Sequence, residues 1–198
     1  MKKKTRNPAA PVVPPAHNWR TSDEEEIARR RLRGQGEQFR ITNHAPSRPV
    51  FSQFRVESES GRVYLVEIRD VAGRQFACEC VDFRTNGLGT CKHVEAVLWH
   101  LEGRMKKRFQ AEVERGPEAV TVVLDQSRGG LRVEGPAKRI PRWMRPWLAG
   151  DRLGAEHAPE EFLQKLRELK NGAARISQEI EPWLGAAPAR SRKPADAA

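Results

Sequence analysis

All three cysteines of this chain fall in one short stretch, residues 78–93, which reads CECVDFRTNGLGTCKH. The pattern is Cys-x-Cys, ten intervening residues, and Cys-x-His. Three thiolates and one imidazole make a closed set of four ligands, which is the donor set that tetrahedral Zn²⁺ takes in structural sites. We therefore predict that one structural Zn²⁺ is bound by Cys78, Cys80, Cys91 and His93.

The spacing within each half of the motif predicts its local structure. Residues i and i+2 of a strand point to the same side, so Cys78 and Cys80 can face one ion if the strand end bends. Cys91 and His93 would diverge in a regular helix, which places Cys91 in a turn and His93 in the first turn of the next helix. His100 lies two helical turns beyond His93, so we expect it to be a surface or packing residue and not a ligand.

The clustering of the cysteines also has weaker interpretations. The three cysteines could be reduced core residues, since a free thiol packs like a small apolar side chain. An odd number of cysteines disfavours a disulfide framework. A nucleophile pair of Cys91 and His93 would need a third, orienting group that the sequence does not indicate. Iron–sulfur ligation suits the tight Cys-x-Cys start less well than a single small ion.

The wider stretch FACECVDFRTNGLGTCKHVEAVLWHL resembles the SWIM-type zinc finger near the N-terminus of bacterial helicase-like ATPases of the Swi/Snf class. The preceding residues SQFRVESESGRVYLVEIRD are similar to the strands of the same module. The similarity covers about residues 37–110 and fades beyond Arg115. It implies that the finger binds nucleic acid or protein inside a larger DNA-translocating machine.

The motor of that family is missing from the sequence. The chain contains no G-x-x-x-x-G-K-[ST] phosphate loop and no Gly-Lys pair, so ATP hydrolysis is not implied. We expect no catalytic activity and no small-molecule substrate.

The charge of the chain indicates a polyanionic partner. The formal net charge is +10 and the isoelectric point is about 10.1, which favours non-specific binding to nucleic acid, DNA in the first place. The candidate phosphate contacts are Lys2, Lys3, Lys4, Arg104, Lys106, Lys107 and Arg108. The alternative is a protein adaptor that docks onto a separately encoded helicase-like motor or recombination factor, with the basic charge serving solubility.

Neither end of the sequence carries an apolar run typical of a signal peptide or a membrane span. Together with reduced, metal-ready cysteines, this predicts a cytoplasmic protein, compatible with association with the nucleoid, and no membrane partner.

The predicted fold class is α+β, with a small antiparallel β-meander and a helix built around the zinc site. We divide the chain into a basic, Pro-rich, disordered arm (1–20), a helix (21–36), the zinc-finger module (37–110), a small mixed α/β region (117–184) and a disordered tail (185–198). Within the segment 21–36, the helix itself is expected to run from Thr21 to Arg33, with Gly34 just after its end. The arginines of that helix are expected to complement its dipole at the surface.

Within the module, apolar and polar residues alternate in FRIT, VFSQFRVES, RVYLVEIRD and RQFACEC, which predicts four short strands. The helix after Cys91 is expected to reach about Phe109, because apolar residues recur at helical spacing. Its inward residues are Val94, Val97, Leu98, Leu101 and Met105, and the residues expected to close the core over the ion are Phe76, Phe83 and Leu88.

In the second region, residues 119–125 and 131–135 predict a hairpin, and residues 159–170 predict a helix. Trp143 and Trp147 lie among prolines and arginines. Such residues can stack on bases, but scarce tryptophans in a polar chain more often anchor a small core.

Overall fold

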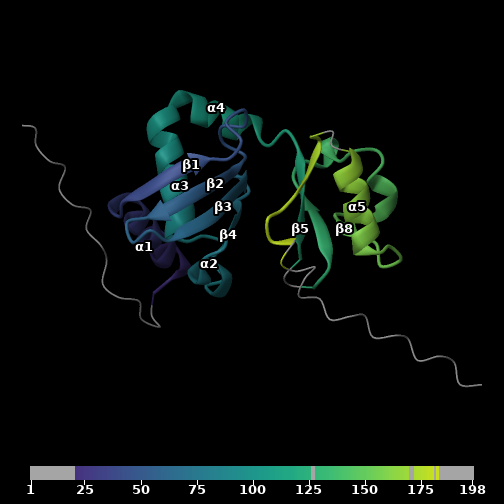
Figure 1. Cartoon of the computed structure of the whole chain (residues 1–198), viewed down its shortest axis with the longest axis horizontal. Helices are drawn as coiled ribbons and strands as arrows, with labels where there is room; N and C mark the ends of the chain where they lie inside the picture. Colours follow the sequence, from purple (N-terminus) through teal and green to yellow (C-terminus); the bar gives the residue numbers. More distant parts are fainter. Residues whose placement is uncertain (1–20, 126–127, 170–171, 181, 183–198) are drawn as a thin grey trace, which may run out of the picture. The chain divides into compact units, whose positions relative to one another are not determined.

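The structure is a computed structural model that describes residues 21–125, 128–169, 172–180 and 182. The chain divides into two compact units whose boundary lies between Pro117 and Glu118 (Figure 1). Each unit combines helices with a mostly antiparallel sheet, so the predicted α+β class is confirmed. The disorder expected for residues 1–20 and 185–198 falls outside the described residues, and so do Lys2, Lys3 and Lys4.

The predicted meander forms the sheet of the first unit. Its strands are β1 (Phe39–Asn43), β2 (Gln53–Ser58), β3 (Val63–Asp70) and β4 (Gln75–Cys78), paired antiparallel in that order. The period of two places alternate side chains on one face, where Phe54, Val56, Val66 and Ile68 are buried. This face is the floor of the first hydrophobic core.

Helix α3 (Lys92–Met105) covers that face, as Figure 1 shows behind the strands. Its apolar stripe is the predicted one: Val94, Val97 and Leu101 are buried, and Leu98 and Met105 pack at the margin.

The prediction of one helix up to Phe109 is wrong. Lys106 has a φ of 46°, in the left-handed region, and a separate helix α4 (Lys107–Arg115) follows. A non-glycine residue rarely adopts that conformation. The break turns α4 so that Phe109 joins the buried core, with Val113 packed against its edge.

The first helix, α1 (Asp23–Gly36), begins with a capping box in which Ser22 Oγ accepts from the Glu25 N–H and the Glu25 carboxylate accepts from the Ser22 N–H. The expected end before Gly34 is wrong, because the helix continues through it. Gly34 instead lies against α3, where an added Cβ would be 2.7 Å from the backbone nitrogen of Ala96 and 2.8 Å from the carbonyl oxygen of Lys92. The glycine is needed for close packing of the two helices.

The second unit has a five-stranded sheet in the order β7-β8-β6-β5-β9. The predicted hairpin is β5 (Val120–Leu124) and β6 (Leu131–Glu134), and β9 (Ala174–Ile176) pairs parallel to β5. The remaining elements are β7 (Leu148–Ala149), β8 (Arg152–Leu153), the 3₁₀ turns η1 (Ala137–Arg139) and η2 (Arg145–Trp147), and α5 (Pro159–Leu169). Helix α5 contributes Phe162, Leu163 and Leu166 to a second core.

Among the described residues, no helix combines the length and apolar character needed to cross a membrane.

Candidate metal centre

The four predicted ligands come from two segments that meet at the end of the sheet. Cys78 is the last residue of β4, and Cys91 and His93 lie at the start of α3, as N-cap and second helical residue. Cys80 lies beyond the strand, as the N-cap of a short helix α2 (Val81–Thr85) that the sequence reasoning did not predict. The Cys80 Sγ accepts a hydrogen bond from the Phe83 N–H at 3.3 Å. The chain was expected to bend after Cys78 so that both thiols could face one ion. In the structure, this bend is the start of helix α2.

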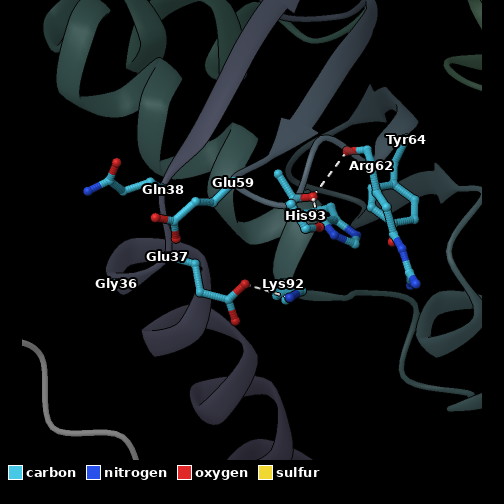
Figure 2. Close-up of a pocket in the computed structure, with 10 residues that line it drawn as sticks. Gly36, Glu37, Gln38, Glu59, Arg62, Tyr64, Lys92 and His93 are labelled. Carbon is cyan, nitrogen blue, oxygen red and sulfur yellow. Dashed lines mark hydrogen bonds and ion pairs between the residues drawn. The ribbon is translucent and has the colours of Figure 1, made fainter.

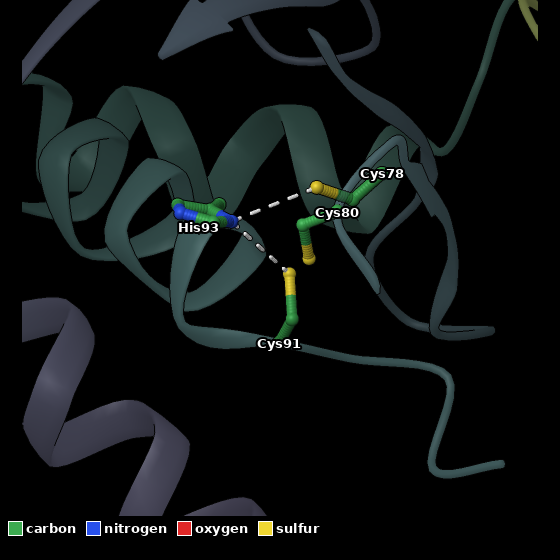
Figure 3. A group of neighbouring side chains, drawn as sticks. All are labelled: Cys78, Cys80, Cys91 and His93. Carbon is green, nitrogen blue, oxygen red and sulfur yellow. Dashed lines mark hydrogen bonds between the residues drawn. The ribbon is translucent and has the colours of Figure 1, made fainter. Parts of the chain in front are cut away.

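Three sulfur atoms and one imidazole nitrogen converge on a common point (Figure 3). The four ligand atoms all lie within 4.8 Å of one another, and all four residues are buried. His93 Nδ1 is 3.8 Å from Cys78 Sγ and 3.9 Å from Cys91 Sγ. This Cys₃His group could hold a metal ion.

The spacing can be compared with that of a tetrahedral site. With bonds of about 2.3 Å to sulfur and about 2.0 Å to nitrogen, tetrahedral angles separate sulfur from nitrogen by about 3.5 Å. The two measured separations are within a few tenths of an ångström of that edge. These two edges fit a four-coordinate ion held through His93 Nδ1. The widest separations in the group reach 4.8 Å, against about 3.8 Å between two sulfurs of a tetrahedral site, so the ligand atoms must close by up to about 1 Å when an ion binds.

The His93 ring is fixed by aromatic neighbours from the sheet. Tyr64 of β3 stacks on it, with ring centroids 4.0 Å apart and planes at 24°, and Phe39 of β1 meets its edge at 5.6 Å. Packing from two strands thus selects the ring orientation that turns Nδ1 toward the sulfurs.

The imidazole also borders a cavity of about 530 Å³, shown in Figure 2. In this view the Glu37 carboxylate points toward Lys92, and the two form an ion pair at 2.5 Å. His93 Nε2 is buried and makes no hydrogen bond within the described residues. An imidazole that binds metal through Nδ1 carries its proton on Nε2, so this atom is a donor.

The three thiols perturb the pKa values of one another. Hydrogen bonding with Cys78 and then Cys91 lowers the pKa of Cys80 well below its usual value, whereas hydrogen bonding with Cys80 raises the pKa of Cys78. For Cys91, the hydrogen bond with Cys78 lowers the pKa, but the bond with Cys80 and burial outweigh it and raise the pKa to about 12. Because the pKa values of Cys78 and Cys91 are raised, a cation that binds all three sulfurs as thiolates must displace protons.

Arginines of α1 hold the loop between the two ligand pairs. Arg30 donates to both carboxylate oxygens of Asp82, at 3.1 and 2.7 Å, and also to Glu26 at 3.0 Å. These bonds raise the pKa of Arg30 although burial acts in the opposite direction. Arg30 therefore forms structural contacts within the first unit, a role beyond the predicted one of complementing the helix dipole at the surface.

Glu95 is a second anchor that the sequence reasoning missed. It is 2% exposed, accepts from the Thr90 hydroxyl at 2.8 Å and pairs with Arg31 at 3.3 Å. The signal in the sequence was an acidic residue directly beside the apolar stripe of α3, where an unpaired carboxylate would be costly.

The predicted phosphate contacts that the structure describes form one exposed group at the junction of α3 and α4. Its members, which we call the α3–α4 basic cluster, are Arg104, Lys106, Lys107 and Arg108. In the part of the chain that is described, none of them forms an ion pair. His100 is half-buried and is not part of the Cys₃His group, as expected.

The sequence reasoning also missed Trp99. This residue is 51% exposed on α3, next to the basic cluster, and it falls outside the apolar stripe. Its signal was its position between Leu98 and Leu101, off the predicted apolar stripe.

The two tryptophans weighed as base-stacking candidates pack in the second core. The rings of Trp143 and Trp147 lie 5.9 and 5.7 Å from that of Phe162. Close to them in the sequence, four cations are exposed and form no ion pair within the described residues: Lys138, Arg139, Arg142 and Arg145.

Comparison with known proteins gave no matching family model, and no curated protein or solved structure is significantly similar to the chain.

Proposed function

We propose that the first unit is a SWIM-type zinc finger whose Cys78, Cys80, Cys91 and His93 bind one structural Zn²⁺. The observation that carries this proposal is the convergence of three buried thiols and one imidazole nitrogen on one point. Soft thiolates with one imidazole in tetrahedral array favour Zn²⁺ over hard cations. A catalytic zinc site keeps one position for water, whereas here four protein ligands fill the coordination sphere, so the ion is structural.

The finger serves nucleic-acid binding, DNA in the first place and without strong sequence preference. Support comes from the net charge of +10 and from the α3–α4 basic cluster, which is exposed. Its first member, Arg104, lies in the last turn of α3, the helix that Cys91 caps and that contains His93, and its other members follow at the break and in α4. The zinc site thus fixes the start of the helix that leads into this cluster. The chain has no catalytic activity of its own in this proposal.

Metal content tests the first half of the proposal. Protein purified under reducing conditions should contain one equivalent of zinc. A content well below one equivalent, or a preference for iron, would overturn the assignment.

Salt-dependent binding tests the second half. A variant with glutamine at Arg104, Lys106, Lys107 and Arg108 is compared with a matched variant with glutamine at Lys138, Arg139, Arg142 and Arg145. Each loses four positive charges. Each phosphate contact contributes about −0.9 to the slope of log affinity against log salt, so the first variant should flatten the slope by up to about 3.6 units.

The matched variant separates a local site from bulk charge. Equal losses in both variants would mean that total charge, and not the α3–α4 basic cluster, drives binding. No detectable binding of the unmodified protein at about 50 mM salt would favour the alternative, an adaptor that docks onto a separate helicase-like motor.

A further inference from the structure

A groove of about 360 Å³ runs between α1, β1 and α3 on the first unit, apart from the Cys₃His group. Its lining includes Trp99, His100 and Arg104 of α3 and Phe39 and Ile41 of β1. Its volume lies in the range of roughly 300–1,000 Å³ that small planar ligands occupy in proteins. None of the four predicted metal ligands lines this groove.

Trp99 offers a flat apolar surface to the groove. Its side chain is 51% exposed, and no aromatic ring is stacked on it among the described residues. The other two described tryptophans, Trp143 and Trp147, pack against Phe162 and are half-buried. Trp99 alone of the three therefore presents a large part of its ring to solvent.

Gly103 lies one helical turn after Trp99 in α3, and both residues line the groove. It is a glycine inside α3 that lines the groove, and an added Cβ would meet no atom within 4 Å, so packing does not require it. A helical side chain covers the turn on its N-terminal side, so any longer side chain at 103 would lie over residue 99. Glycine at this place weakens the helix relative to alanine but leaves the groove open beside Trp99.

The charges around the groove favour an anionic ligand. Arg104 lines it, and the rest of the α3–α4 basic cluster follows in the next residues of the chain. Glu37 is the acidic residue of the lining, and its carboxylate is bound by Lys92 at 2.5 Å and by Arg33 at 3.0 Å. Its negative charge is therefore compensated and does not repel phosphate.

His100 adds a polar group that is neutral at physiological pH. Burial, and then the charge of Arg104, lower the pKa of His100. A neutral imidazole can both donate and accept a hydrogen bond, as the edge of a base requires.

We propose that this groove binds an unpaired nucleobase, stacked on Trp99, while Arg104 and the following cations contact the phosphates on either side. The inference rests on the proposed nucleic-acid binding and specifies it as binding to single strands. A base in a duplex is stacked between its neighbours and cannot enter the groove, whereas an aromatic platform beside cations is the usual arrangement for single strands.

Binding of labelled 12-nucleotide single strands, as DNA and as RNA, and of a blunt duplex of the same sequence tests the proposal on the full chain. Trp99→Ala should weaken single-strand binding by roughly five- to 150-fold, the range for one base–aromatic stack. The salt slope should not change, because no charge is removed. Trp99→Phe should be intermediate, and duplex binding should be the same in all three proteins.

Gly103→Gln is a second variant that does not depend on removing the tryptophan. The longer side chain should narrow the groove beside Trp99 and weaken single-strand binding while leaving the fold intact. Gly103→Ala, which adds one methyl group that meets no atom within 4 Å, serves as its control. The DNA and RNA arms show which strand is bound more tightly.

Retained single-strand affinity in Trp99→Ala, together with a loss on neutralising the α3–α4 basic cluster, would overturn the stacking role and leave the proposed function standing. An equal loss for single strand and duplex would also overturn it. An absence of any nucleic-acid binding at low salt would instead remove the proposed function and this inference together.

Discussion

Two glycines inside helices of the first unit are expected to respond to alanine with opposite signs. Both lie in the α1–α3 pair, Gly34 on α1 and Gly103 on α3. Intrinsic helix propensity alone would stabilise either substitution by about 0.5–1 kcal/mol. For Gly103→Ala nothing opposes this gain, because the added methyl group meets no atom within 4 Å.

For Gly34→Ala the environment reverses the sign. The methyl carbon would lie 2.7 Å from the Ala96 nitrogen and 2.8 Å from the Lys92 carbonyl oxygen, and both are backbone atoms that cannot rotate away. The helices must separate, and overpacking of this kind costs about 1–3 kcal/mol. The separation would also stretch the Glu37–Lys92 ion pair, which lies at 2.5 Å. Since two backbone atoms obstruct the methyl group, the overpacking cost is placed in the upper part of this range, at about 2–3 kcal/mol. Subtracting the propensity gain of about 0.5–1 kcal/mol leaves an expected net destabilisation of about 1–2.5 kcal/mol.

Urea unfolding of the zinc-loaded protein, followed by circular dichroism, measures both free energies under the same conditions. Gly103→Ala should raise the unfolding midpoint, and Gly34→Ala should lower it. A Gly34→Ala protein as stable as the unmodified chain would refute the close helix contact, and with it the reason given for the continuation of α1 beyond residue 33.

Three further predictions concern the metal, its anchors and catalysis. Cys80→Ser should reduce zinc content and the order of residues 74–110, because serine can still cap α2 as Cys80 does but is a poor zinc ligand. His100→Ala is the control and should keep its full zinc content. Equal zinc content in the two variants would contradict the ligand assignment. Arg30→Ala breaks the bonds to Asp82 and Glu26 and should lower the free energy of unfolding in urea by about 1–3 kcal/mol. Arg33→Ala breaks an exposed pair with Glu37 and should lower it by less than about 1 kcal/mol. The reverse order would be evidence against the anchoring role of Arg30. The purified chain should turn over no ATP with or without DNA, because no phosphate loop is present, and turnover that survives stringent purification would contradict this.

The local parts of the fold could be predicted because their signals are short-ranged. The Cys-x-Cys and Cys-x-His spacings identified the four residues that converge, and the period of two in residues 53–70 identified strands β2 and β3. Both signals depend on neighbours along the chain, so no knowledge of tertiary packing was needed.

The errors arose where tertiary contacts override local preference. Gly34 was interpreted as a helix end because glycine commonly follows one, but here it serves the approach of a second helix. No glycine or proline marks the break at Lys106, which is maintained by burial of Phe109 on the far side. Helix α2 is too short to form alone and depends on its cap by Cys80.

The resemblance placed the start of the finger near residue 37, but the contacts show that α1 is part of the same folding unit. Asp82 and Glu95 face guanidinium groups from α1, and Glu95 is 2% exposed. A fragment that begins at residue 37 would leave Asp82 without Arg30 and deprive buried Glu95 of Arg31, and would expose the face of α3 that Gly34 covers. Breaking partly buried, charge-assisted contacts of this kind costs about 1.5–3 kcal/mol each, a large share of the stability of a small domain.

We therefore expect residues 21–117 to fold with one equivalent of zinc and residues 37–117 to bind zinc more weakly and unfold at lower urea concentration. Both fragments keep all four ligands, so a difference between them measures the contribution of α1. Fragments of equal stability and zinc affinity would show that the arginine contacts from α1 are dispensable and that the ligands alone determine the local structure.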